Sequence, residues 1–260
     1  MIKKNIINDK QRWFRNLLFV FLSLLSFDNI YAQNPLPTIN PVAIFTNING
    51  EEEESTQYSG SAPIIGRFTA NPENEAGWSA TYEWRFTLEG SMNPSEELNG
   101  KPYLTRYEQD TEYTFTKAGS HAIVLYAIFV QGKDTVYYTD EYWQDMQPLR
   151  VTISESRLDM PNAFSPNGDG INDVYKAKEN WQSLVEFKAT IYNRWGQKLY
   201  EWTDPSDGWD GTFHGQDVKQ GVYYVNVEAR GADGRKYHIR RDVNLLRGYT
   251  EEGNSSSNDY

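Results

Sequence analysis

The feature that most constrains the fold is a short alternation of apolar and polar residues, broken every few positions by Gly, Asn, Asp or Pro. In residues 187–192, for example, the apolar Phe, Ala and Ile alternate with Lys, Thr and Tyr. A period of two places successive side chains on opposite faces of a strand. No long amphipathic helical pattern interrupts these runs. The alternating part of the sequence therefore predicts antiparallel strands.

Residues 1–32 differ in kind from the rest of the chain. An apolar run covers residues 17–27, and Ala32 offers a cleavage position before Gln33. The residues that precede the run are rich in positive charge: Lys3, Lys4, Lys10, Arg12 and Arg15. The run is shorter than the roughly 20 apolar residues that span a bilayer. Residues 1–32 are therefore predicted to be a secretory signal peptide, with no transmembrane segment after it.

Charge and cysteine content narrow the functional classes. The formal net charge is −11 and there is no cysteine. Residues 1–32 carry five basic and two acidic residues, so their removal leaves a net charge of −14. Nucleic acids and anionic membranes require a basic face, so the sequence argues against both as partners. Without disulfides, an exported chain depends on its hydrophobic core.

Residues 38–155 are expected to form a first domain. Turn residues separate seven predicted strands, at residues 42–45, 64–69, 81–87, 112–116, 122–130, 135–139 and 149–154. Such a series is typical of an immunoglobulin-type sandwich. The four successive acids at 51–54 predict a solvated loop, because like charges resist burial. Residues 72–77 and 90–102 are loops by composition.

Two stretches make the first domain more specific. Trp84 shares one predicted strand face with Tyr82 and Phe86, which places all three in the core. Residues 113–125 form a predicted strand, a Gly-containing turn and a second strand. Together they resemble a PKD-type sandwich over the second half of the domain. The Trp-x-Phe-Gly-Asp-Gly turn of that family is missing.

Residues 156–247 are expected to form a second domain. Further strands are predicted at 198–202, 222–229 and 236–245, with a hairpin turn at Asp233-Gly234. The polar residues 248–260 are predicted to be a disordered tail. The predicted fold class is all-β: two tandem antiparallel β-sandwich (immunoglobulin-like) domains after a signal peptide.

Four short motifs follow one another in the second domain. They read PNAFSPNGDGIND at 161–173, IYNRWG at 191–196, GWDGT at 208–212 and GVYY at 221–224. Their order and spacing resemble the gliding motility-associated C-terminal domain of Bacteroidetes, the type B sorting domain of the type IX secretion system. That family usually ends just after its final strand, whereas this chain continues for thirteen residues from Gly248.

The resemblance implies a route and a partner. The protein would cross the inner membrane by its signal peptide, and the type IX machinery would then export it from the periplasm to the cell surface or the medium. The motif positions that the resemblance implies as site residues are Pro161, Asn162, Phe164, Ser165, Pro166, Asn167, Gly168, Asp169, Gly170, Asn172, Asp173, Asn193, Arg194, Trp195, Gly196, Trp209, Asp210, Gly211, Gly221 and Tyr223.

The motifs also have a physical interpretation of their own. Trp195 and Trp209 each stand beside a turn, and a large aromatic in that position is expected to plug the core. Asp210 is expected to cap its own turn. Tyr223 and Tyr224 point to opposite faces of one strand, so only one of them belongs to the core.

One motif carries a possible metal site. Asn167, Asp169 and Asp173 place oxygen ligands at positions 1, 3 and 7 of a loop, as calcium loops do. Position 5 is Ile171 and position 12 is Lys178, where such loops have further oxygen ligands. The favoured interpretation is a tight turn without metal, with calcium as the alternative. No other cofactor is expected.

Candidate catalytic groups are sparse. Asp207, Asp210 and Asp217 lie near Trp209, and paired carboxylates perform glycoside hydrolysis. These acids fall in predicted turns without a predicted cleft. The three histidines, His121, His214 and His238, lack metal-ligand spacing. The sequence therefore favours a protein that is not an enzyme.

The first domain leaves its role open. Residues 140–145 mix acids with Tyr and Trp, a composition that stacks on sugar rings or forms an edge loop with one buried ring. The predicted function is a non-enzymatic exported or cell-surface protein with a spacer or a protein- or glycan-interaction domain. Its further partners would be cell-surface polysaccharide or other surface proteins. The alternatives are a structural component of a gliding or adhesion apparatus and a carbohydrate-active accessory protein.

Overall fold

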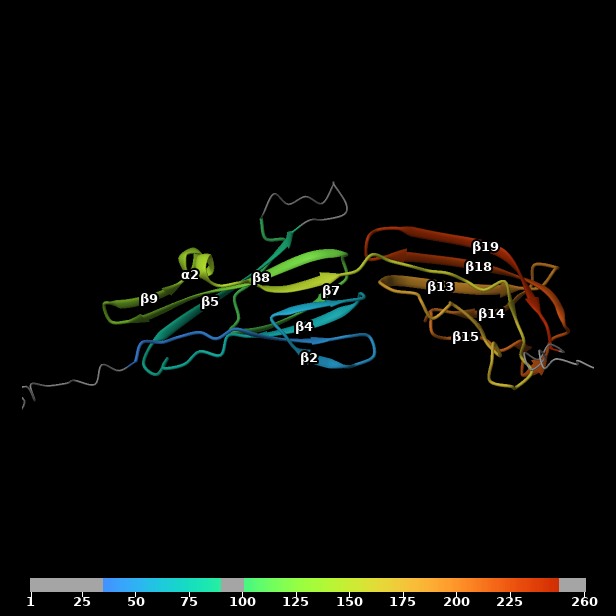
Figure 1. The fold of residues 1–260 in the computed structure, drawn as a ribbon, viewed down its shortest axis with the longest axis horizontal. Coiled ribbons are helices and arrows are strands. Elements are labelled where there is room, and N and C mark those ends of the chain that lie inside the picture. The colour runs from blue at the N-terminus through green and yellow to red at the C-terminus, as the bar shows by residue number, and fades with distance from the viewer. Residues whose placement is uncertain (1–34, 90–100, 248–260) are drawn as a thin grey trace, which may run out of the picture.

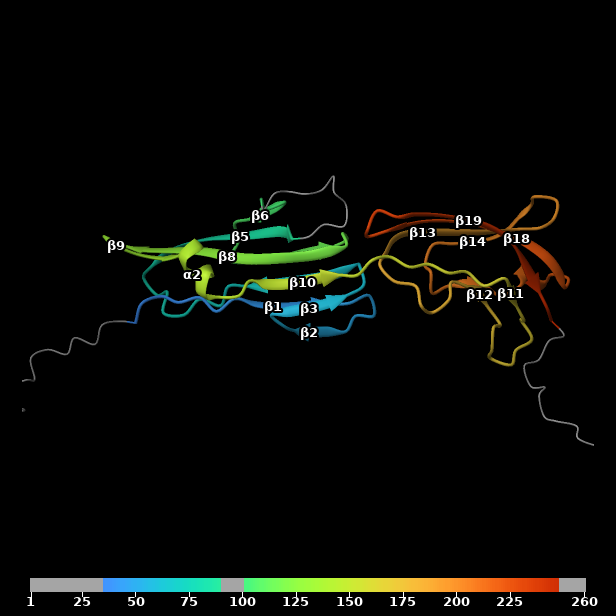
Figure 2. The same cartoon turned by 45° about the horizontal axis from the view of Figure 1, so that its top comes forward.

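The computed structural model describes residues 35–89 and 101–247. The predicted signal peptide, the predicted tail and most of the predicted 90–102 loop lie outside these ranges. Apart from one short helix, the regular elements of the described chain are strands, in two sandwiches that lie end to end (Figures 1 and 2). Within it, no helix combines the length and apolar character needed to cross a bilayer. The all-β fold class is confirmed.

The first sandwich is built from two sheets. The smaller has the order β2 (Glu52–Glu54), β1 (Val42–Thr46), β4 (Ile64–Thr69) and β7 (Asp110–Phe115). The larger has the order β3 (Gln57–Gly60), β10 (Leu149–Ile153), β8 (Gly119–Gln131), β5 (Ser79–Glu89) and β6 (Leu104–Arg106), with β9 (Asp134–Tyr138) also paired to β8. All pairs are antiparallel except β3–β10. The seven predicted strands are all present, with ends shifted by a few residues.

Aromatic side chains fill the core between these sheets. Trp84 is fully buried, and Tyr82 and Phe86 lie buried on the same face of β5, as predicted. The indole Nε1 of Trp84 donates a hydrogen bond to the carbonyl oxygen of Gln109 at 3.2 Å. Its ring packs 5.8 Å from that of Phe68 on the opposite sheet. The buried indole therefore joins the two layers and keeps its polar atom satisfied.

Two predictions for the first sandwich are wrong. Glu52–Glu54, predicted as a loop, form strand β2 paired antiparallel with β1. An edge strand with exposed side chains leaves every carboxylate in solvent, so pairing and charge do not conflict. Residues 140–145, for which the sequence offers an edge loop or a sugar-stacking stretch, form the short helix α2 (Asp140–Asp145), so the loop is wrong. Its Tyr142 and Trp143 are both half-buried against the first core.

The second sandwich has one large sheet and two short ladders. The sheet order is β11 (Ala163–Phe164), β19 (Lys236–Leu245), β18 (Gly221–Gly231), β13 (Leu184–Tyr192) and β14 (Lys198–Trp202). The ladders pair β12 (Tyr175–Lys176) with β15 (Gly208–Trp209) and β16 (Thr212–Phe213) with β17 (Gln216–Asp217). The predicted hairpin at Asp233-Gly234 joins β18 to β19, with Gly234 at a φ of 80°. A separate hydrophobic core lies between the sheet and the ladders.

Hydrogen bonds join the two sandwiches where they meet. The backbone N–H of Ala62 donates to the hydroxyl oxygen of Ser183 at 3.1 Å, and the N–H of Ala118 donates to the carbonyl of Ala232 at 2.9 Å. The hydroxyl groups of Ser183 and Ser154 lie 2.8 Å apart. Ser183 is fully buried, so its own two contacts are shielded from water. The junction is therefore a packed contact as well as a chain connection.

Candidate functional site

Three of the four sequence motifs meet in the core of the second sandwich. Phe164 of the first motif, Trp209 of the third and Tyr223 of the fourth form one aromatic cluster. The ring centroids of Phe164 and Trp209 are 5.4 Å apart, and those of Trp209 and Tyr223 are 5.1 Å apart. Trp209 is fully buried and donates from its indole Nε1 to the carbonyl of Thr212 at 2.7 Å. Its predicted role as a core plug is confirmed.

The structure shows which of the two tyrosines of the fourth motif belongs to the core. Tyr223 is buried and donates its hydroxyl hydrogen to the carbonyl of Lys219 at 2.7 Å. Tyr224 is exposed on the other face of β18. The prediction that only one of the two belongs to the core is confirmed.

The first motif folds into a loop around one carboxylate. Asp173 accepts hydrogen bonds from the backbone N–H groups of Asn167 at 2.9 Å, Gly168 at 2.7 Å and Gly170 at 2.8 Å. The bond from Gly168 contributes most to holding the pKa of Asp173 below its ordinary value, followed by the bond from Gly170. The side chain of Asp169 accepts in the same way from the N–H of Ile171 at 2.8 Å.

These contacts bear on the calcium alternative. Both carboxylate oxygens of Asp173 already accept hydrogen bonds within the loop, and the Asn167 side-chain oxygen accepts from the N–H of Asp169 at 3.0 Å. Across 35–89 and 101–247, no three His, Asp or Glu side chains are grouped so as to hold a metal ion. The arrangement favours the tight turn, and calcium at Asn167, Asp169 and Asp173 stays a prediction.

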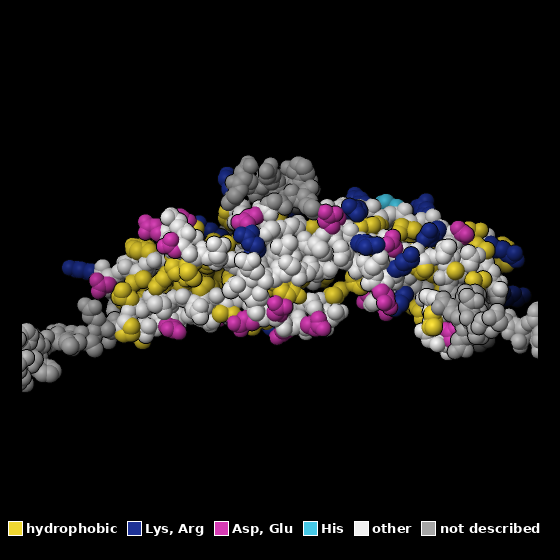
Figure 3. All heavy atoms as spheres, in the orientation of Figure 1, with side chains coloured by type: hydrophobic (Ala, Val, Ile, Leu, Met, Phe, Trp, Pro, Cys, Tyr) yellow, Lys and Arg dark blue, Asp and Glu magenta, His cyan; other side chains and the backbone are white. Residues whose placement is uncertain are grey.

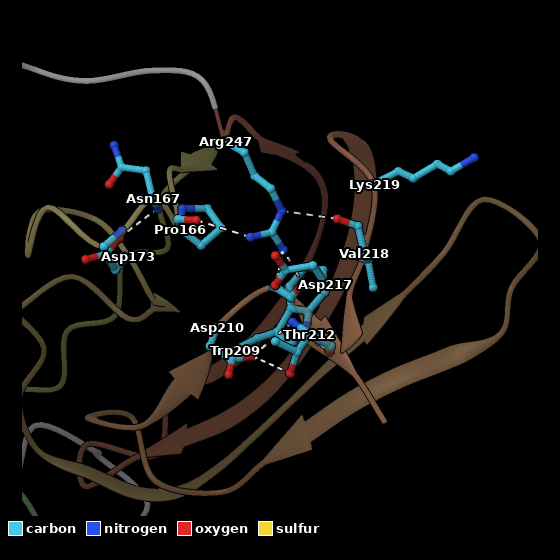
Figure 4. Close-up of polar contacts among 12 residues, drawn as sticks. Pro166, Asn167, Asp173, Trp209, Asp210, Thr212, Asp217, Val218, Lys219 and Arg247 are labelled. Atoms are coloured by element: carbon cyan, nitrogen blue, oxygen red, sulfur yellow. Dashed lines mark hydrogen bonds and ion pairs between the residues drawn. The ribbon is translucent and has the colours of Figure 1, made fainter. Parts of the chain in front are cut away.

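Arg247 connects the first and third motifs to the end of the last strand (Figure 4). Its guanidinium donates to the carbonyl oxygens of Gly211 at 2.7 Å, Pro166 at 3.1 Å and Val218 at 3.2 Å. It also forms an ion pair with Asp217 at 3.2 Å. A planar guanidinium suits such convergent acceptors because its N–H groups diverge in fixed directions. The motif pattern does not include Arg247, whose only sequence signal is its place after the last predicted strand.

The third motif is shaped for this contact. Gly211 has a φ of 82°, and a Cβ atom there would lie 3.1 Å from both Arg247 Nη2 and Pro166 Cγ. The carboxylate of Asp210 accepts from the backbone N–H of Thr212 at 2.9 Å and from its hydroxyl at 2.8 Å. The prediction that Asp210 caps its own turn is confirmed.

The second motif lies apart from the aromatic cluster. The side-chain oxygen of Asn193 accepts from the backbone N–H groups of Trp195 and Gln197, both at 3.0 Å, and shapes the turn from β13 to β14. Trp195 is 75% exposed, so its predicted role as a core plug is wrong. The turn carries its indole away from the second core, and the guanidinium of Arg194 stacks on it, 4.3 Å from the ring centroid.

The remaining motif positions hold the backbone of the same region. The carbonyl of Pro161 accepts from the hydroxyl of Tyr175 at 2.9 Å, and that of Asn162 accepts from the N–H of Asn244 at 3.0 Å. The N–H of Ser165 donates to the carbonyl of Asn172 at 2.8 Å. Positive φ angles occur at the motif positions Gly168, Gly170, Asn172, Gly196, Gly211 and Gly221.

Of the candidate catalytic acids, Asp207 is exposed, and the others are held by contacts within the fold. Asp210 caps a turn and Asp217 pairs with Arg247, while the ring of Trp209 is inside the core. His121 is buried in the first sandwich, where its Nε2 lies 2.9 Å from the carbonyl of Lys117 and burial lowers its pKa. His214 lies in the turn between β16 and β17, and His238 lies in β19.

The geometry of the motifs agrees with a comparison against protein families. Residues 158–240 match the CHU_C Type IX secretion signal domain. The chain carries a type IX secretion signal domain. The match confirms the resemblance seen in the motifs, and it identifies a protein that this secretion system exports to the cell surface or the medium. The secretion signal domain implies contact with the secretion machinery.

Two solved structures share weak overall similarity with the chain. One is the dimeric latent PorU of Porphyromonas gingivalis, at 10% identity and a TM-score of 0.24, which covers 85% of this chain and 21% of that one. The other is a tetra-tandem repeat from the extending region of a large adhesion protein, at 11% identity and a TM-score of 0.24, covering 82% and 68% respectively. The chain thus spans about a fifth of PorU. No curated protein matches the sequence.

Proposed function

We propose that the secretion signal domain directs the export of a non-catalytic first sandwich. Outside the cell, this sandwich acts as a spacer or as an interaction module. The match of residues 158–240 to the secretion signal family carries this proposal. The motif residues would hold this domain in shape, since Phe164, Trp209 and Tyr223 meet in one aromatic cluster and Arg247 binds the carbonyls of Pro166 and Gly211. The two units would be domains at residues 38–155 and 156–247.

The contacts of the candidate acids support a non-catalytic role. A general acid and base need two carboxylates free to face a substrate. Asp210 is bound within its turn, and Asp217 is paired with Arg247. Their structural roles account for both residues.

The contacts of helix α2 favour a spacer over a sugar-binding platform at that helix. The indole Nε1 of Trp143 donates to the carbonyl of Leu125 at 2.8 Å, and the ring of Tyr142 packs 5.1 Å from that of Tyr138. Both rings are half-buried, so these two side chains contribute to the packing of the first sandwich. Sugar binding needs aromatic faces that are open to solvent.

The export role can be tested with the complete chain in a host that has the secretion system. We expect the full-length protein in the medium or the outer-membrane fraction, and a chain ending after residue 155 in the periplasm. Mass spectrometry of each fraction would report the location and the mature ends together. Export of the shortened chain at the full-length level would contradict the proposal.

The same fractions separate the possible roles outside the cell. Retention in the outer membrane would favour a surface component of an adhesion apparatus, and release would favour a free protein. A glycan array with the purified protein tests the interaction module. We expect no specific binding if the first sandwich is a spacer.

A further inference from the structure

An exposed apolar surface lies at the end of the second sandwich that is far from the first. Trp195 is 75% exposed, Val222 48% and Tyr224 47%. Trp195 belongs to the β13–β14 turn, and the other two belong to the start of β18. A groove of about 660 Å³ lies between the turn and the strand, and its lining also includes Phe213 and Leu199.

Two neighbouring arginines add positive charge to this surface. The guanidinium of Arg194 stacks on the ring of Trp195, and Arg240 donates from its Nε to the side-chain oxygen of Asn226 at 3.0 Å. Arg240 lies opposite Asn226, two pairs along from the pair of Tyr224 and Asp242, on the same sheet face. Within 35–89 and 101–247, neither guanidinium forms an ion pair with a carboxylate.

The positive charge of these two arginines is a local feature of the surface, since the whole chain is acidic, with a net charge of −11. Figure 3 shows Lys and Arg side chains concentrated over the second sandwich, while acids cover the part of the first sandwich near β2. An exposed apolar patch with a polar rim is a common mark of a protein interaction site. Unpaired guanidinium groups at its rim favour a partner that supplies carboxylates.

We propose that Arg194, Trp195, Val222, Tyr224 and Arg240, which we call the distal surface, form the docking site for an acidic protein surface of the export machinery. This inference rests on the proposed export function. Trp, Tyr and Arg are the residue types that dominate binding energy at protein interfaces. The sandwich core does not use these side chains, so their exposure has no explanation in folding.

A protein partner fits the distal surface better than a glycan does. Arg194 covers one face of the Trp195 indole, which leaves a sugar ring only the other face to stack on. A carboxylate from a partner can instead approach the edge of that guanidinium while an apolar side chain enters the groove. The occupant is therefore a protein surface with an apolar centre and acidic neighbours.

The first test compares export of the full-length protein with that of the double variant Trp195→Ala/Tyr224→Ala. We expect the fraction outside the cell to fall about tenfold, with accumulation in the periplasm, as for loss of two interface anchors. The matched control is Tyr107→Ala/Tyr137→Ala, which removes two exposed rings from the first sandwich. Thermal unfolding of the purified variants should match wild type, because all four side chains are exposed.

A second pair of variants tests the charge. Arg194→Glu/Arg240→Glu should reduce export by a similar factor, because it opposes an acidic partner. The control Lys101→Glu/Lys133→Glu makes the same change in net charge on exposed residues of the first sandwich. Equal effects of the two charge variants would show that only total charge matters, and would overturn the docking site.

A photo-crosslinking amino acid in place of Trp195 locates the partner in intact cells. We expect a crosslink to an outer-membrane component of the export machinery, and none from the same group placed at Tyr137. The outcomes separate this inference from the proposed function. Failure of the wild-type chain to leave the periplasm contradicts the export function itself. Normal export of the distal-surface variants contradicts the docking site alone.

Two other occupants would also overturn the docking site. One is a glycan, shown by array binding that Trp195→Ala/Tyr224→Ala abolishes while export stays normal. The other is a second copy of the chain, shown by a wild-type dimer in sedimentation that the same variant converts to monomer with normal export.

Discussion

The guanidinium of Arg247 donates a hydrogen bond of 2.7 Å to the carbonyl oxygen of Gly211, thirty-six positions earlier in the chain. The same side chain reaches the carbonyls of Pro166 and Val218. It thereby ties the end of the last strand to the loops that carry the first and third motifs. One residue outside the motifs thus fixes the positions of two of them.

Replacing Arg247 by Ala should destabilise the second sandwich by about 1.5–3 kcal/mol, since three carbonyls lose a charged donor. Urea unfolding followed by hydrogen-exchange mass spectrometry would report the two sandwiches separately. The control is Arg230→Ala, which removes an exposed ion pair with Glu186 and should cost less than about 1 kcal/mol. Equal losses of unfolding free energy for the two changes would show that the Arg247 contacts stabilise the sandwich no more than an exposed ion pair does.

A comparison of Gly211 with Gly196 can measure the steric part of the contact between Arg247 and Gly211. Both have left-handed φ angles, 82° and 80°, but a Cβ at Gly211 would meet Arg247, Pro166 and Leu245, whereas one at Gly196 would meet nothing within 4 Å. Gly196→Ala should therefore cost only the backbone term, about 1–2 kcal/mol. Gly211→Ala should cost more, because it adds displacement of Arg247.

Equilibrium unfolding of the two glycine variants gives the comparison directly. The expected signature is a lower urea midpoint for Gly211→Ala than for Gly196→Ala, with similar slopes. In the background of Arg247→Ala the difference between the two should shrink, because the displaced guanidinium is gone. An unchanged difference would assign the extra cost to Pro166 and Leu245.

The two turn tryptophans show how far sequence reasoning reaches. Both stand beside a glycine turn, yet Trp209 is fully buried and Trp195 is exposed. Trp209 lies in β15, whose pairing with β12 places the ring over the main sheet. Trp195 lies in a hairpin turn at the end of that sheet, and no described element covers it. Local patterns predict the turn, but long-range pairing decides what covers the side chain.

Strands, like turns, follow from local patterns in the sequence. Alternation is a local property, so β4, β14 and β19 have the predicted bounds. The contacts of Arg247 with residues 29, 36 and 81 positions away have no local signal. The four successive acids at 51–54 predict a loop, because like charges resist burial. In an edge strand their carboxylates stay in solvent, so strand pairing does not require burying charge.

The pKa of Asp173 gives a prediction for acid conditions. Hydrogen bonds from backbone N–H groups, that of Gly168 first, lower this pKa in the folded protein from the ordinary value of 3.8. The stabilisation is therefore fully present above that value, and it is lost as the pH falls through the lowered pKa. Asp173→Asn removes this contribution at every pH.

The measurement is the urea midpoint of the second sandwich between about pH 6 and about pH 2.5, for wild type and Asp173→Asn. We expect a clear gap at the upper end that narrows as the pH falls. Asp134→Asn, an exposed carboxylate of the first sandwich, controls for the removal of one charge. A gap that stays constant across the range would exclude titration of Asp173 as its cause.

The chain connection between the sandwiches is held by Asp233, in the hairpin turn from β18 to β19. Its carboxylate accepts from the hydroxyl of Ser156 at 2.7 Å and from the backbone N–H of Ser156 at 3.1 Å. Burial raises the pKa of Asp233, but the hydrogen bonds from Ser156 and Arg235 outweigh it and leave the pKa below its ordinary value. The contact is therefore strongest above the ordinary value of 3.8 and is lost as the pH falls through the lowered pKa.

Asp233→Ala should release this connection while both cores remain folded. Loss of hydrogen bonds to a charged acceptor costs about 1.5–3 kcal/mol, so protection of the connection against proteolysis should fall about tenfold or more. Limited proteolysis of the full-length protein, with cleavage sites read by mass spectrometry, provides the measurement. Asp134→Ala makes the same change in the exposed β8–β9 hairpin and should leave the cleavage pattern unchanged. If both variants resist cleavage at residues 154–158 as well as wild type does, the other contacts, such as that of Ser183 with Ala62, hold the connection without Asp233.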